Sequence, residues 1–153
     1  MNIYDVLVPE LRDDPAGIGY ASMNDQERMV AYYAENQQAR QLVPLWQLKK
    51  FLVETGLLLA LQQAATSHES VDVRAAAALT LVYIDDPRFN NLDMDLQSTK
   101  TLIGGLVLGG VVTAEVAALI DAMADTVTSR AKILGCTNAA DGHFSSAKKI
   151  IEV

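Results

Sequence analysis

Residues 70–87, SVDVRAAAALTLVYIDDP, decide the fold class. Ser70 can accept a hydrogen bond from a free backbone N–H group of a following helix, and Asp72 suits the positive end of the helix dipole. The run 75–84 is rich in alanine and leucine, which favour helices, and its small side chains allow a neighbouring helix to approach closely. Pro87 ends the helix because the residue before a proline avoids the helical conformation. The stretch therefore predicts a capped helix that packs tightly against others.

Similar signals extend in both directions from this stretch. Asn24 and Glu27 have the spacing of a capping box, in which each side chain binds a backbone N–H group of the other residue. Pro44 fits the first turn of another helix, and Thr113 can cap a later one. Further helices are expected over 3–11, 24–36, 44–56, 57–65, 98–108, 126–134 and the last residues of the chain. No stretch predicts a convincing strand, and residues 37–43 are expected to be irregular. We therefore predict an all-α protein with one domain over 1–153, a compact bundle of about six to seven short helices.

The composition is that of a folded, acidic protein. Half of the 153 residues are hydrophobic, and the formal net charge is −7. Because phosphate backbones repel an acidic surface, we expect no nucleic-acid partner. The longest near-apolar run, residues 102–112, is too short to span a bilayer, so we expect no membrane insertion. The first residues are acidic and amphipathic, unlike a secretion signal, and the single cysteine, Cys136, has no disulfide partner. These features predict synthesis in a reducing cytoplasm.

No group of residues has the spacing of a catalytic or metal site. His68 and His143 have no nucleophile or further ligand at a meaningful distance along the chain. The carboxylates of residues 85–95 could bind a hard cation, but they lack the central glycine and terminal glutamate of a calcium loop. The glycines at 104–105 are not followed by the Gly-Lys-Ser/Thr of a phosphate loop and fit close helix packing instead. We therefore expect no enzymatic activity, no cofactor and no metal.

Two stretches together resemble a known protein family. The first is DPAGIGYASMND at residues 14–25, and the second combines GGVVTAE at 109–115 with TSRAKILG at 128–135. The pairing is similar to a family of small tailed-bacteriophage proteins that are encoded among virion structural genes. These proteins typically open with DPxGxGYAxM(T/S)D and close with SRAxxLG. The present chain departs from the pattern at Asn24, where threonine or serine is expected, and at Lys132, where an acidic residue is expected.

The resemblance implies a biological context and no particular chemistry. It implies a structural or assembly protein of the phage particle, from the tail or tail-tip region, whose partners are other phage structural proteins. The protein would then be made in the host cytoplasm and be located in the virion. Association with further copies of itself stays open. A second hypothesis is a small acidic phage effector that binds a host protein, which would need carboxylates gathered on one face.

Candidate interface residues come from the two motifs and from a group of aromatic residues in the first third of the chain. Exposed aromatic side chains make strong anchors in protein interfaces, although the same side chains could instead fill the core. Arg130 could contact a partner, or it could pair with an acidic residue of its own chain such as Asp121 or Asp125. The candidate interface residues are Tyr4, Asp14, Pro15, Gly17, Gly19, Tyr20, Tyr32, Tyr33, Trp46 and Arg130.

Overall fold

The computed structural model describes residues 2–152, which form nine α-helices, one 3-10 turn and four short strands. The helices are α1 (Ile3–Asp13), α2 (Asp25–Tyr33), α3 (Leu45–Glu54), α4 (Leu57–Ser67), α5 (Val71–Asp85), α6 (Gln97–Leu108), α7 (Ala114–Ala122), α8 (Arg130–Ile133) and α9 (Asp141–Ile151). The strands are β1 (Gln37–Arg40), β2 (Val43–Pro44), β3 (Asn91–Leu92) and β4 (Asp125–Thr128), and the 3-10 turn is η1 (Tyr20–Ser22). The predicted helical character is confirmed, but the description as purely all-α with six to seven helices is imprecise.

The strands correct two expectations from the sequence. Residues 37–43 were expected to be irregular, but they contribute β1 and the start of β2. The helix expected over 126–134 is replaced by β4 and the short helix α8. Thr126, Val127 and Thr128 are all β-branched, which lowers helix propensity and favours an extended backbone. Ser129 then caps α8 by accepting a hydrogen bond from the Lys132 N–H group.

Residue contacts divide the chain into two compact units. Unit 1 comprises the N-terminal residues up to Ala39 together with the chain from Val127 onward, and unit 2 comprises Arg40–Thr126. The boundary falls inside β1 and inside β4, which pair with each other as a two-stranded sheet. The single domain predicted from the sequence stays a prediction.

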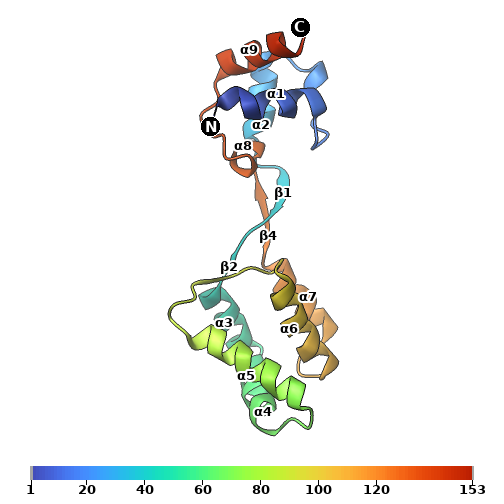
Figure 1. Cartoon of the computed structure of the whole chain (residues 1–153), viewed down its shortest axis with the longest axis vertical. Helices are drawn as coiled ribbons and strands as arrows, with labels where there is room; N and C mark the ends of the chain where they lie inside the picture. Colours follow the sequence, from blue (N-terminus) through green and yellow to red (C-terminus); the bar gives the residue numbers. More distant parts are fainter. Residues whose placement is uncertain (1, 153) are drawn as a thin grey trace. The chain divides into compact units, whose positions relative to one another are not determined.

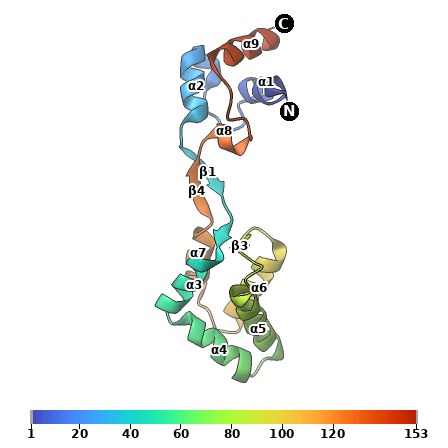
Figure 2. The same cartoon turned by 90° about the vertical axis from the view of Figure 1, so that its left-hand side faces the viewer.

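Unit 1 is built around α9, which packs against both α1 and α2 (Figures 1 and 2). Its core combines aromatic side chains with small ones, so that the helices meet closely. The buried members are Leu7, Leu11, Tyr20, Tyr32, Ala131, Cys136, Ala139, Phe144 and Ala147. Asn24 and Glu27 form the predicted capping box at the start of α2, with hydrogen bonds of 2.9 and 2.8 Å. The core thus draws on segments from both ends of the chain.

Unit 2 is a helical layer in which α5 packs against α3, α4 and α6, and α6 packs against α7 (Figure 1). The short strands β2 and β3 pair antiparallel, with Val43 opposite Leu92 and Pro44 opposite Asn91. This pairing fixes the long loop between α5 and α6 against the start of α3. Among residues 2–152, no helix combines the length and the apolar character needed to cross a lipid bilayer.

Gly109 allows the end of α6 to approach the start of α5 closely. A Cβ atom at Gly109 would lie 2.5 Å from a methyl carbon of Val73, well inside van der Waals contact, and one at Gly105 would lie 3.9 Å from the Cβ atom of Ala76. Gly109 ends α6, while Val73 lies in the first turn of α5. The two helices are therefore antiparallel and closest at this end. The close packing was predicted for Gly104 and Gly105, but a Cβ atom at Gly104 would meet nothing within 4 Å and one at Gly105 would make only an ordinary contact. The close approach lies instead at Gly109.

Candidate functional site

Residues 14–25 and 128–135 of the resemblance lie in unit 1, whereas residues 109–115 lie in unit 2. A buried ion pair in unit 1 connects α1 to the start of α8. Arg130, the first residue of α8, donates from Nε to Glu10 Oε1 at 2.8 Å and from Nη2 to Glu10 Oε2 at 2.6 Å. The two side chains are only 14% and 2% exposed. These hydrogen bonds raise the pKa of the Arg130 guanidinium above its ordinary value. Of the two alternatives for Arg130, the structure shows the pairing with an acidic residue of its own chain, but the partner is Glu10 of α1 and not Asp121 or Asp125.

Tyr20 links the N-terminal motif to the same ion pair. Its side chain is fully buried, and its hydroxyl donates to Glu10 Oε1 over 3.4 Å. Its carbonyl oxygen accepts a hydrogen bond of 2.9 Å from Arg28 Nε, whose own side chain is buried. Burial, and after it the negative charge of Glu10, raise the pKa of the Tyr20 phenol strongly. Tyr20 is therefore part of the core of unit 1 and is not an exposed anchor.

The DPAGIGY loop has its own internal support. Asp14 ends α1 in the left-handed conformation, with φ of 41°, and its carboxylate accepts hydrogen bonds from the N–H groups of Ile18 and Gly19 at 2.8 and 2.6 Å. Gly17 and Gly19 both have positive φ angles, of 65° and 88°, which strain any other residue. Pro15, which follows Asp14, is exposed. The aspartate and the glycines are thus explained by loop geometry.

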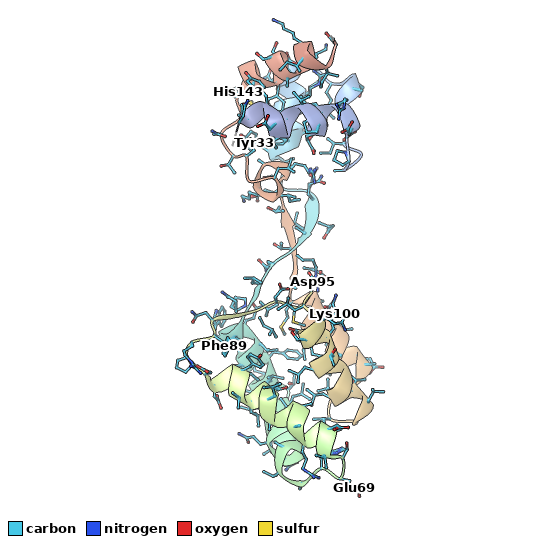
Figure 3. The ribbon with its side chains drawn as sticks, in the orientation of Figure 1. Tyr33, Glu69, Phe89, Asp95, Lys100 and His143 are labelled. Carbon is cyan, nitrogen blue, oxygen red and sulfur yellow. The ribbon has the colours of Figure 1, made fainter. Side chains whose placement is uncertain are left out.

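Tyr32 and Tyr33 form hydrogen bonds to the segment that follows α8. The Tyr32 hydroxyl donates to the Cys136 carbonyl at 3.2 Å, and the Tyr33 hydroxyl donates to the Ala139 carbonyl at 2.8 Å. The Tyr32 ring also meets the Phe144 ring edge to face, with centroids 5.5 Å apart. Tyr32 is fully buried, so the structure places it in the core. Tyr33, which is labelled in Figure 3, is half-buried.

The remaining two aromatic candidates have different surroundings. Tyr4 is half-buried on α1 and meets the ring of His143 edge to face, with centroids 6.0 Å apart. Trp46 lies on α3 in unit 2 and is 69% exposed. Of the five aromatic candidates, Trp46 is therefore the one whose side chain is mainly available to a partner. The predicted interface residues do not gather into one surface: most of them build the interior or the loop of unit 1.

A different surface, which the sequence did not indicate, lies in unit 2. A groove of about 830 Å³ opens between α5 and α6 under the loop that connects them. Its apolar walls include Leu45, Ala76, Tyr83, Leu92 and Leu102. Its rim carries Leu42, Leu79, Phe89 and Leu96, which are 53%, 47%, 44% and 52% exposed. Large apolar side chains that remain this exposed around one concave site are typical of a binding surface. We call this site the α5–α6 groove.

Three aspartates elsewhere in unit 2 are bound to basic side chains of the same chain. Arg40 binds Asp121 and Asp125 at 2.7 and 2.8 Å, and it also pairs with Asp95 at 3.3 Å. Lys100 pairs with Asp95 at 3.7 Å, and both side chains are labelled in Figure 3. The Arg40 hydrogen bond lowers the pKa of the Asp95 carboxyl, and the three aspartates raise the pKa of Arg40. These carboxylates hold a cationic side chain of the protein itself.

Both histidines have structural hydrogen bonds. His68 accepts at Nδ1 from the Ser70 N–H group at 3.1 Å, which leaves Nε2 to donate to the Gly109 carbonyl at 3.0 Å. His143 accepts at Nδ1 from the Ala140 N–H group at 3.0 Å, at the start of α9. Within residues 2–152, no three histidine, cysteine, aspartate or glutamate side chains lie where they could hold a metal ion together.

Comparison with protein-family models, with curated proteins and with solved structures gave no match to this chain.

Proposed function

We propose that this chain is a structural or assembly protein of a tailed-bacteriophage particle, from the tail or tail-tip region, and that it acts by protein–protein contact without catalysis. The observation that carries the contact role is the α5–α6 groove with its exposed apolar rim. The phage context rests on the resemblance of residues 14–25 and 128–135 to the tailed-phage family.

The geometry of unit 1 supports a scaffold role for the motif residues. Glu10, Tyr20 and Arg130 satisfy one another inside the unit, so none of them needs a ligand. Within residues 2–152, no buried side-chain nitrogen or oxygen atom lacks a hydrogen-bond partner. A buried polar network that is fully satisfied fixes the positions of the elements that it joins. The motifs would thus shape the protein, and the surface of unit 2 would bind.

The charge distribution gives less support to an acidic effector that imitates nucleic acid. Such a mimic needs unpaired carboxylates along one face, as phosphates are arranged along a backbone. Here Arg40 engages three aspartates, and Lys49 pairs with Asp85 at 2.7 Å. Basic side chains therefore lie among the acidic ones.

Quantitative mass spectrometry of purified phage particles tests the proposal. We expect peptides of this chain to persist in particles through density-gradient purification, at a constant ratio to a known tail protein. A host cytoplasmic protein, followed in the same fractions, controls for carry-over. If the chain falls away together with the host protein, and is also missing from assembly intermediates, the proposal is wrong.

A further inference from the structure

We infer that the α5–α6 groove binds an amphipathic helix of a partner protein, and that this helix carries a lysine or arginine beside its apolar face. The inference rests on the proposed contact function and names the class of partner for that same site. Its basis is the shape of the groove, the nature of its walls and the sign of its charge.

The shape follows from the packing of α5 and α6. A close approach of Val73 and Gly109 joins the start of α5 to the end of α6, and Ala76 lies beside Gly105 next to it. The groove begins beside these residues, since Asp72, Ala76 and Gly105 line it. It continues along Leu79 and Tyr83 of α5 and along the first turns of α6, where the helices diverge (Figure 1). Two helices that diverge from a close crossing leave room for the side-chain ridge of a third helix.

The walls of the groove favour an apolar occupant. Tyr83 and Phe89 meet edge to face with ring centroids 4.9 Å apart, and Phe89 (labelled in Figure 3) is still partly exposed. Leu79, Leu96 and Leu102 supply further apolar surface from α5, from the loop and from α6. A helix with leucine-like side chains along one face would remove this surface from water.

The charge of the groove selects a basic partner. Asp72 and Asp93 line the groove, whereas none of the lysines and arginines in the described part of the chain does. Among residues 2–152, the ion pairs of unit 2 leave out both of these aspartates. A second copy of this chain also carries a net charge of −7, so repulsion disfavours it as the occupant. A cation that approaches Asp72 or Asp93 gains an attraction that an acidic surface cannot offer.

Peptide binding to the full chain tests the inference. The probe is a fluorescent amphipathic peptide of about 18 residues, with leucines at i, i+3, i+4 and i+7 and lysines beside that face. The matched probe has glutamates in place of the lysines. By fluorescence anisotropy we expect the lysine probe to bind at least about tenfold more tightly than the glutamate probe, and the difference to shrink in high salt.

Variants locate the site of binding. The double variant Asp72→Asn/Asp93→Asn should bind the lysine probe roughly three- to tenfold more weakly than the parent protein. Thr101→Arg, which places a bulky cation at the groove, should abolish binding of the probe. Glu69→Gln is the matched control: it removes a carboxylate that lies just before α5 and outside the groove, and it should leave affinity unchanged. Circular dichroism and thermal unfolding establish that each variant is folded.

Several results would overturn the inference. They are absence of binding by the lysine probe, equal affinity for both probes, or binding that Thr101→Arg does not affect. A dimer in native mass spectrometry that Thr101→Arg abolishes would assign the groove to self-association instead. Because the particle experiment does not depend on these probes, failure here leaves the proposed function standing, and failure there leaves the peptide result standing.

Discussion

The contact between Glu10 and Arg130 shows at the scale of single residues how a charged pair is kept inside a small unit. Both carboxylate oxygens are engaged by the guanidinium, and one of them also accepts from the Tyr20 hydroxyl. Removal of one charge would leave the other buried without a partner, which costs much more than the loss of an exposed pair.

We therefore expect Arg130→Ala to lower the free energy of unfolding of unit 1 by about 3–5 kcal/mol. Urea denaturation followed by circular dichroism measures this change. Arg12→Ala, which removes the exposed pair with Asp13, is the control and should change stability far less, because water screens an exposed pair. A loss at Arg130 no larger than at Arg12 would contradict the role assigned to the buried pair.

The buried tyrosines make unit 1 sensitive to alkali. The pKa values of Tyr20 and Tyr32 are raised in the folded protein, mainly by burial, whereas in the unfolded chain they are about 10. The unfolded state then loses protons first as the pH rises, so this contribution to stability is complete below about pH 10 and is lost above it. We expect Tyr20→Phe to reduce the steepness of the loss, measured as the urea midpoint from pH 8 to pH 11. A slope equal to that of the parent protein would refute this assignment.

At the scale of elements, the sequence predicted individual helices and their caps better than it predicted the contacts between distant segments. The capping box at Asn24 and the helix that begins after Ser70 were predictable because their hydrogen bonds connect near neighbours in sequence. Strand β4 was missed because β-branched residues 126–128 were assigned to the helix after them, and because its partner β1 is distant in sequence. The groove could not be predicted for a similar reason. Residues as far apart as Leu42 and Leu102 line it, and the hydrophobic periodicity of a single helix does not indicate which distant residues lie together.

Gly109 and Gly104 offer a matched test of the α5–α6 packing. Gly109→Ala would place a methyl group 2.5 Å from a Val73 side-chain carbon and should destabilise unit 2 by about 1–3 kcal/mol. Gly104→Ala meets nothing within 4 Å and lies inside α6, so it should stabilise by up to about 1 kcal/mol. Thermal unfolding of both variants measures the difference. If both substitutions changed the stability of unit 2 in the same direction, α6 would not approach α5 as described.

At the scale of the whole molecule, the division into two units predicts which residues a destabilising substitution affects. Arg130→Ala should raise hydrogen exchange mainly in residues up to 39 and from 127 onward, whereas Gly109→Ala should raise it mainly in residues 40–126. Peptide-resolved exchange measured by mass spectrometry compares the two variants, each serving as the control for the other. Equal acceleration throughout the chain in both would instead support the single cooperative domain predicted from the sequence.

The partnership of Glu10 with Arg130 also has a consequence for synthesis on the ribosome. The two residues are 120 positions apart. At cellular elongation rates of roughly 5–20 residues per second, Arg130 is therefore synthesised on the order of 6–24 s after Glu10. The whole of unit 2 emerges during that interval. The N-terminal part of unit 1 is therefore translated before unit 2, but its native interior is completed after unit 2 has emerged.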